Sequence, residues 1–420
     1  FTPLFVSSDE KFDDASAAQS LCGIALPLFS YSAFLLLYNI SAKNATKTIY
    51  GTAKNPYNEI TKCKALEKQS QKGRKIMRKF EHYLHGVNLG GWLSQNSDTS
   101  KKHYETFITE KDIAYIASLG LDHVRVPVDY ILLEEEDGTP KSEGYLYLDN
   151  CLRWCRTHGI RMILDLHKTF GYSFDPLDET DKTVFFYDTA LQERFYTLWK
   201  ILAARYGGEP ELVAFELLNE IIEPEVAEAW NGIALHAIAE IRKFAPESWI
   251  IFGGVMYNNV LSVPMLAEVT DPKVAYTFHS YEPLIFTHQG AYWVKGMPSD
   301  FRISYPNTIE NYREASKMLS QKLAGAIFEG ELPEMGPDFF ETLFRPALDI
   351  AEERDIPLYC GEYGVIDLAD NDSKIRWAAD ICAVFDKYGI GRAYWNYKEK
   401  DYGIVDIPDE GVQRELAAKL

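Results

Sequence analysis

From residue 85 onward, short apolar segments of the chain alternate with longer amphipathic ones. The short segments are typical of buried strands, because they are near-continuous runs of branched and aromatic residues. We recognise eight of them, at residues 85–91, 123–129, 161–167, 213–220, 249–255, 274–281, 357–364 and 391–397.

The longer segments repeat apolar residues at three- and four-residue steps, which predicts helices. Clear examples cover residues 110–120, 191–207, 226–244 and 373–389, and several of them end at glycine. Strand and helix alternating eight times, with strands apolar on both faces, predict an α/β fold, a (β/α)8 TIM barrel over residues 81–420. An open doubly wound sheet is the alternative, but the segment GVNLGGW lacks the glycine spacing of a phosphate-binding turn.

Residues 1–80 differ in composition from the rest and are predicted to be an N-terminal extension. The apolar run at residues 21–40 is about long enough to cross a bilayer, but acidic residues precede it, unlike in a signal peptide. If the run spans a membrane, the basic segment after it predicts a cytoplasmic barrel. Alternatively, the natural protein starts at Met77 and residues 1–76 have no folded role. A start at Met77 favours the cytoplasm, and an extracellular location is the alternative.

The overall charge restricts the class of partner. The chain has a formal net charge of -19 and an isoelectric point near 5.0, which disfavours nucleic acid and anionic lipid and suits a neutral substrate. The cysteines lack the spacing of a zinc site or of a dense disulfide framework, so we expect buried free thiols. They are Cys22, Cys63, Cys151, Cys155, Cys360 and Cys382.

Polar, ionisable and aromatic residues occur at the C-terminal ends of the predicted strands. In a parallel barrel these ends meet at one face, where active sites are built. Placing such groups on apolar strands is costly unless they line a functional cavity. The residues are Asn88, Arg125, His167, Asn219, Glu220, His279, Tyr281, Glu362 and Trp395.

Glu220 and Glu362 form a candidate catalytic pair. Hydrolysis of a glycosidic bond with retention needs one protonated carboxylic acid and one ionised carboxylate, about 5 to 5.5 Å apart. The segments RVP, LH, NE, HSY, GEYG and YWNY, in this order at successive strand ends, resemble glycoside hydrolase family 5, the cellulase family of clan A. The resemblance covers residues 85 to about 408.

The resemblance implies a retaining hydrolase without metal or organic cofactor, with Glu220 as acid/base and Glu362 as nucleophile. It also implies that Arg125 lies near Glu362, where a cation would lower the carboxyl pKa, and that Tyr281 donates a hydrogen bond to Glu362. His279 is expected near Glu220.

The resemblance implies three sugar-binding roles. It places Asn219 at the sugar 2-hydroxyl and Trp395 under the sugar ring, and it makes His167 a supporting residue. The third strand departs from the family, since many members have two successive histidines where this chain has His167 and Lys168. We interpret Glu216 as a strand residue that faces away from Glu220.

Two long insertions, at about 168–188 and 282–340, follow the third and sixth strands and belong to the same face of the barrel. Aromatic residues of the top-face loops are candidates for sugar subsites, and Asn88 is a candidate supporting residue. These aromatic residues are Trp92, Phe170, Tyr172 and Trp293.

We therefore predict an enzyme that cleaves an unbranched β-linked glucan, most simply an endo-β-1,4-glucanase. The expected partner is a β-glucan oligo- or polysaccharide, with no nucleic acid and no obligate protein partner. An exo-β-1,3-glucanase or another β-glycosidase of the family is the alternative. A metal-dependent hydrolase would need clustered ligands on the first strand, which has one histidine. A non-catalytic sugar-binding barrel should have lost Glu220 or Glu362.

Overall fold

The computed structural model describes residues 77–176, 178, 181–319 and 332–420. Within them, eight parallel strands close into a barrel, each strand pairing with its sequence neighbours and β1 pairing with β8. The strands are β1 (His85–Asn88), β2 (His123–Asp129), β3 (Arg161–Lys168), β4 (Val213–Glu216), β5 (Ile250–Gly253), β6 (Val274–His279), β7 (Leu358–Tyr363) and β8 (Gly391–Tyr394). The predicted TIM barrel is thereby confirmed.

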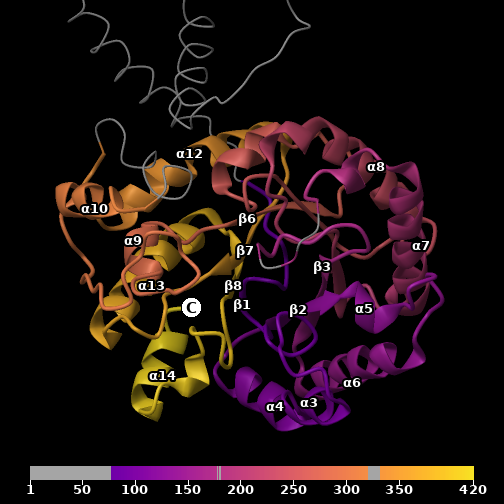
Figure 1. Cartoon of the computed structure of the whole chain (residues 1–420), viewed down its shortest axis with the longest axis horizontal. Helices are drawn as coiled ribbons and strands as arrows, with labels where there is room; N and C mark the ends of the chain where they lie inside the picture. The colour runs from indigo at the N-terminus through magenta and orange to yellow at the C-terminus, as the bar shows by residue number, and fades with distance from the viewer. Residues whose placement is uncertain (1–76, 177, 179–180, 320–331) are drawn as a thin grey trace, which may run out of the picture. The chain divides into compact units, whose positions relative to one another are not determined.

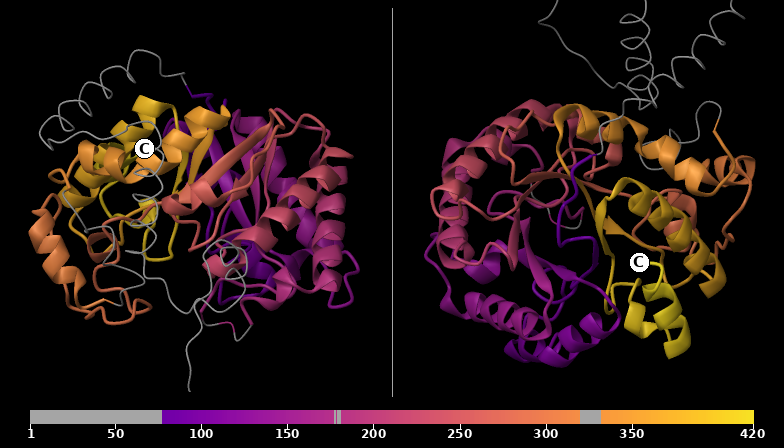
Figure 2. Two further views of the ribbon diagram at one scale, coloured as in Figure 1. Left: turned by 90° about the horizontal axis from the view of Figure 1, so that it is seen from above. Right: turned by 180° about the vertical axis from the view of Figure 1, so that it is seen from behind.

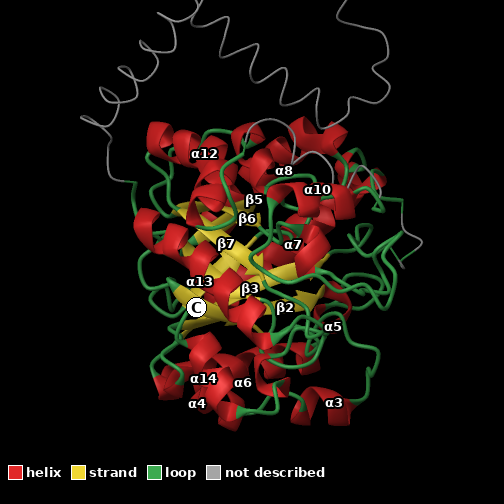
Figure 3. Ribbon diagram, turned by 90° about the vertical axis from the view of Figure 1, so that its left-hand side faces the viewer, coloured by secondary structure: helices red, strands yellow, loops and turns green. Residues whose placement is uncertain are grey.

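Helices surround the strands on the outside of the barrel (Figures 1 and 3). The turned views in Figure 2 show the same ring of helices from above and from behind. The helices are α3 (Lys101–Thr106), α4 (Glu110–Ser118), α5 (Tyr130–Leu133), α6 (Ser142–His158), α7 (Thr189–Tyr206), α8 (Ala227–Arg242), α9 (Leu284–Thr287), α10 (Ile309–Ser316), α12 (Pro337–Arg354), α13 (Asn371–Tyr388) and α14 (Glu410–Ala417).

Ordinary capping interactions mark the ends of these helices. Thr109 and Asp112 form a capping box at the start of α4, and the Asp370 carboxylate accepts from the backbone of Ser373 at the start of α13. Helices α6 and α13 end at Gly159 and Gly389, both in the left-handed conformation that glycine adopts without steric cost. These signals explain why the predicted helix bounds agree with the structure to within a few residues.

An apolar cluster fills the N-terminal end of the barrel. Phe80 and Tyr83, which precede β1, stack at 4.5 Å, and Phe80 also packs edge-on against Trp249 and Tyr359. The polar residues of the candidate site lie at the opposite, C-terminal end of the barrel. The residues before β1 thus belong to the barrel core, which extends upstream of the predicted boundary at residue 81.

The apolar run at residues 21–40, like the whole segment 1–76, lies outside the described residues, as do Cys22 and Cys63. Across the part of the chain that is described, no helix is both long enough and apolar enough to cross a membrane. The other four cysteines are buried free thiols, as predicted.

Candidate active site

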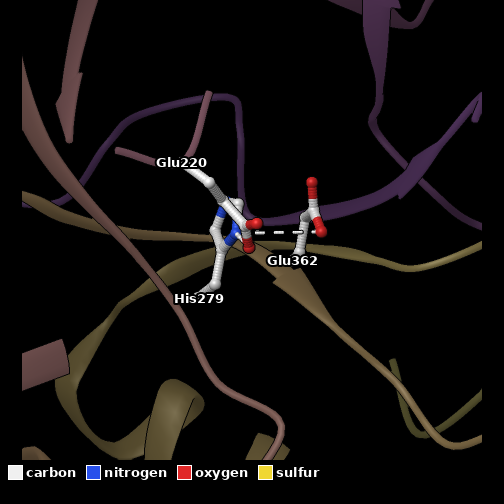
Figure 4. A group of neighbouring side chains, drawn as sticks. All are labelled: Glu220, His279 and Glu362. Atoms are coloured by element: carbon white, nitrogen blue, oxygen red, sulfur yellow. Dashed lines mark hydrogen bonds and ion pairs between the residues drawn. The ribbon is translucent and has the colours of Figure 1, made fainter. Parts of the chain in front are cut away.

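Two carboxyl groups face each other at the C-terminal end of the barrel (Figure 4). Glu362 lies on β7, and Glu220 follows β4 after the strand has ended. One oxygen of each carboxyl and one ring nitrogen of His279 lie within 4.8 Å of one another. This spacing agrees with a retaining pair, whose carboxyl groups lie about 5 to 5.5 Å apart, and is shorter than the roughly 6.5 to 9.5 Å of an inverting pair.

Arg125, on β2, connects the nucleophile candidate to the inside of the barrel. Its fully buried guanidinium donates to Glu362 Oε1 at 2.8 Å and to both carboxylate oxygens of Glu216 at 2.7 and 2.9 Å. It also lies 3.0 Å from Asp165 Oδ2. One cation thus compensates three carboxyl groups, and the expected contact between Arg125 and Glu362 is confirmed.

The amides of Asn88 and Asn219 complete the surroundings of Arg125. Each accepts from the guanidinium through its side-chain oxygen at 2.9 Å. Asn88 uses its amide nitrogen on the backbone carbonyls of Gly361 and Ala393, at 2.9 and 3.1 Å. Asn88 therefore supports Arg125 from within the barrel.

The interpretation of Glu216 as a residue facing away was wrong. Its buried carboxylate points into the barrel and holds Arg125. The alternation of strand residues does not relate Glu216 to Glu220, because β4 ends at Glu216 and the chain leaves the ladder before Glu220. Burial raises the pKa of Glu216 to about 7, although Arg125 opposes the rise.

The nucleophile candidate Glu362 is held at both oxygens. Tyr281 donates to Oε2 at 2.9 Å, opposite the contact of Arg125 with Oε1. Burial raises the pKa of Glu362, while Arg125 and the Tyr281 hydrogen bond lower it. Arg125 lowers this pKa as expected, but the cost of burying the charge is larger, so the net shift is upward.

The acid/base candidate Glu220 has a different environment. Burial and the nearby Glu362 carboxylate raise the pKa of Glu220 well above its usual range. His279 Nδ1 lies 2.8 Å from Glu220 Oε1, and burial lowers the pKa of His279, so the ring that contacts Glu220 is neutral. Arg125 and Tyr281 favour charge on Glu362 through direct hydrogen bonds, whereas Arg125 lowers the Glu220 pKa only through its charge.

Tyr172, which the sequence suggested as a sugar-subsite residue, instead contacts the backbone of Glu220. Its ring is buried, and its hydroxyl donates to the backbone carbonyl of Glu220 at 2.8 Å and accepts from the backbone N–H of Ile222 at 3.0 Å. The loop after β3 therefore fixes the backbone of the acid/base residue. A hydrophobic pattern could not have indicated this contact, because it depends on a hydroxyl at the tip of a buried ring.

The side chains expected to hold the sugar lie next to the carboxyl pair. The amide nitrogen of Asn219 is buried without a hydrogen-bond partner among the described groups, which suits a donor to a substrate oxygen. Trp395 lies parallel to His167, with ring centroids 6.1 Å apart. Gly90 lies against Trp395, since a Cβ atom at Gly90 would come within 2.5 Å of the Trp395 ring.

Trp92 does not reach this site. Its ring is fully buried, stacks on Trp154 and donates to the backbone carbonyl of Tyr104 at 2.9 Å. The loop after β1 turns this ring inward, so Trp92 packs within the protein. Lys168, which stands where many family members have histidine, pairs with Asp178 at 2.8 Å.

Aromatic rings from the insertion after β6 extend the site on the side of Tyr281. His288 packs edge-on against Tyr281 at 5.1 Å and lies 6.2 Å from Trp293. Trp293 is 40% exposed, and the adjacent Tyr292 is 84% exposed. The predicted subsite candidate Trp293 is therefore available to a ligand on the Tyr281 side of the site.

Glu220, His279 and Glu362 also have the mutual spacing of metal ligands. A carboxylate that binds a metal must be deprotonated, whereas Glu220 has a strongly raised pKa and a histidine partner. The three residues thus fit proton transfer better than metal coordination.

A parallel barrel with two close carboxyl groups of unlike pKa at its C-terminal face defines a retaining glycoside hydrolase. The sequence model of the cellulase family, glycosyl hydrolase family 5, matches residues 84–401. The chain belongs to this family.

Curated relatives agree with this assignment. Endoglucanase C of Acetivibrio thermocellus is 38% identical over 334 residues, which cover 79% of this chain and 96% of the relative. Cellodextrinase A of Ruminococcus flavefaciens is 38% identical over 316 residues, 75% of this chain and 86% of the relative. The crystal structure of an endoglucanase from Thermotoga maritima has the same fold, with a TM-score of 0.62 at 22% identity, and covers 80% of this chain and 97% of that one.

Proposed function

We propose that the protein is an endo-β-1,4-glucanase that cleaves an unbranched β-linked glucan by double displacement. The observation that carries the proposal is the close carboxyl pair, with Glu362 held by Arg125 and Tyr281 and Glu220 bonded to a neutral His279. The names of the two relatives at 38% identity, an endoglucanase and a cellodextrinase, support a β-glucan as the substrate class.

In the first step, a Glu362 oxygen bonds to the anomeric carbon while the bond from that carbon to the leaving oxygen breaks. Glu220 transfers its proton to the leaving oxygen, which departs as a sugar hydroxyl. Arg125 and Tyr281 favour the ionised Glu362 that the attack needs, and burial favours the protonated Glu220. The product of this step is a glycosyl ester of Glu362.

In the second step, the ionised Glu220 removes a proton from water, whose oxygen attacks the anomeric carbon. The ester bond to Glu362 breaks, and the carboxylate is restored. Once Glu362 is esterified it no longer carries a charge, so one cause of the raised Glu220 pKa disappears. Glu220 then ionises more readily, as a general base requires.

Neighbouring residues have proposed roles in binding. Asn219 donates its free amide N–H to the sugar 2-hydroxyl, a contact that strengthens in the transition state. The sugar whose bond is cleaved lies on Trp395, near His167. The exposed ring of Trp293, beside His288, forms the platform for the sugar on the leaving side.

Product analysis on a panel of glucans tests the proposal. The purified protein should release oligosaccharides of several lengths from carboxymethyl cellulose and mixed-linkage glucan, and its activity should survive a chelator. Glucose released only from laminarin would instead identify an exo-β-1,3-glucanase. The Glu362→Ala variant controls for contaminating enzymes, and absence of hydrolysis across the panel would overturn the proposal.

A further inference from the structure

The loop after β1 contains a residue with a strained backbone beside the site. Gln95 has a backbone φ of 55°, in the left-handed region that a non-glycine residue adopts at a cost in stability. Its neighbours fix the loop, because Leu93 bridges Val128 and the Ser94 hydroxyl donates to Asp129 at 2.6 Å. A turn alone would be served better by glycine, so a glutamine at this position points to a role for its side chain.

The Gln95 side chain ends on the imidazole of His167. Gln95 Nε2 lies 3.1 Å from His167 Nε2, and the other ring nitrogen, Nδ1, lies 2.6 Å from Asp165 Oδ2. The ring plane is fixed independently, since Trp395 lies parallel to it and Phe174 packs edge-on at 4.9 Å. His167 therefore has protein partners at both nitrogens and along its ring.

The partners determine which nitrogen carries the proton. Asp165 Oδ2 lies 3.0 Å from the Arg125 guanidinium and 2.6 Å from His167 Nδ1. Burial raises the pKa of Asp165 to about 7, although Arg125 lowers it, so above that pH the carboxylate only accepts and His167 Nδ1 carries the proton. Burial lowers the pKa of His167 to about 3, so the ring is neutral and its Nε2 has a lone pair. The amide N–H of Gln95 is the described donor for that lone pair.

We propose that Gln95 is a positioning residue that, together with Asp165, holds His167 in one tautomer and presents its remaining amide N–H and its carbonyl oxygen to a hydroxyl of the sugar on Trp395. The second part rests on the proposed function. Because Gln95 occupies His167 Nε2, the polar contact with the sugar passes from the imidazole to the amide. An amide offers both a donor and an acceptor, whereas the neutral ring nitrogen offers one lone pair.

Two substitutions separate this role from a purely structural one. Gln95→Gly removes the amide and relieves the backbone strain, so its melting temperature should equal or exceed that of the wild type. Its kcat/KM on an aryl β-cellobioside should nevertheless fall about five- to tenfold, the effect of one or two neutral hydrogen bonds. Gln95→Ala should lose both stability and activity. Full kcat/KM in Gln95→Gly would overturn the proposal.

Asn96→Ala is the matched control on the same loop. Asn96 is half-buried like Gln95 and donates to the backbone carbonyl of Trp92 at 2.6 Å, with no contact to His167. Its kcat/KM should equal that of the wild type. An equal loss in Asn96→Ala and Gln95→Gly would mean that the loop, and not the amide of Gln95, is responsible.

The tautomer of His167 can be determined by NMR in the absence of substrate, independently of any activity. In the wild type, at a pH above the Asp165 pKa of about 7, ¹⁵N NMR should show Nδ1 protonated and Nε2 unprotonated. In Gln95→Glu, a carboxylate that only accepts should draw a proton onto Nε2. A wild-type His167 protonated at Nε2, or an unchanged signal in Gln95→Glu, would overturn the tautomer assignment. Failure of the wild type to cleave any β-glucan would contradict the proposed function, but the NMR spectrum would still test the tautomer of His167.

Discussion

The two oxygens of Glu362 have different partners, and the partner at Oε2 can be removed without disturbing the other. Tyr281 donates to Oε2, and this hydrogen bond lowers the Glu362 pKa against the rise that burial causes. Glu362 must be ionised to attack, so activity is lost as the pH falls through its pKa. The Tyr281→Phe substitution should therefore move the acidic limb of kcat/KM upward by about 0.5 to 1 pH unit.

The same pH profile contains its own control. The basic limb belongs to Glu220, which must be protonated, so activity is lost as the pH rises through its raised pKa. Tyr281 does not bond to Glu220, so this limb should move less than the acidic one. An acidic limb that stays in place in Tyr281→Phe would contradict the role of Glu362.

Azide distinguishes the roles of the two carboxyl groups. In Glu220→Ala, a substrate with a good leaving group should still glycosylate Glu362, and azide, which needs no general base, should then release a β-glycosyl azide. In Glu362→Ala, azide should attack the activated β-glycoside directly and give the α-product. The anomeric configuration is read from the NMR spectrum of the product. Exchanged anomers would reverse the assignment, and full activity in either variant would refute it.

The catalytic residues that the sequence indicated share one property: each lies in or directly after an apolar strand run and has a known chemical role. Glu220, Glu362, Arg125 and Tyr281 could be found in this way. Glu216 could not, because its orientation depends on where the β4 ladder ends. Tyr172 and Gln95 act through specific side-chain hydrogen bonds made from loops, and no periodicity in the sequence encodes such contacts.

At the level of elements, the loop after β1 and the segment after β8 approach closely at Gly90. A Cβ atom at this position would come within 2.5 Å of the Trp395 ring, so the Gly90→Ala substitution should displace the ring. We expect a higher KM for cello-oligosaccharides and a loss of about 1 to 3 kcal/mol in stability from overpacking. Steady-state kinetics and urea unfolding measure the two effects.

Gly232 supplies the matched control for this substitution. It lies on the exposed side of α8, where an added Cβ meets nothing within 4 Å. Gly232→Ala should raise stability by about 0.5 to 1 kcal/mol, since alanine is the better helix former, and leave KM unchanged. A wild-type KM in Gly90→Ala would show that Trp395 does not bind the sugar in the way we propose.

Hydrophobic pattern located the strands well and their ends poorly. Predicted strands at residues 213–220 and 391–397 stop at Glu216 and Tyr394 in the structure. Leu217 and Leu218 are buried although the strand has ended, and the Leu217 N–H still donates to the backbone carbonyl of Ile251 at 3.1 Å. A run of buried residues reports the environment of the side chains, whereas a strand end is set by backbone pairing with its neighbours.

For the whole molecule, the core sets where the chain can be shortened. Phe80 is fully buried in the cluster at the N-terminal end of the barrel, and Arg78 donates to the backbone carbonyl of Asp355 at 2.6 Å. A chain that starts at Met77 should keep wild-type stability and activity. A chain that starts at Glu81 should lose about 3 to 5 kcal/mol in urea unfolding, the cost of removing a buried phenylalanine.

The Phe80→Ala substitution in the full-length chain separates this packing effect from deletion itself. It should cost about as much as the start at Glu81, because both remove the same ring from the cluster. A large loss of stability in the chain that starts at Met77 would instead show that residues 1–76 contribute to the folded state.

Arg125 connects five strands through its side chain: it stands on β2 and contacts groups from β1, β3, β4 and β7. In terms of amide hydrogen exchange, the C-terminal ends of these strands should then open together as one cooperative unit. Lysine has fewer donors and a different geometry, so Arg125→Lys should raise the exchange rates of all five ends together, measured by mass spectrometry. Faster exchange confined to β2 would show that the strands open independently. If they open together, the part of the barrel that carries the chemistry is also the part whose local unfolding one residue controls.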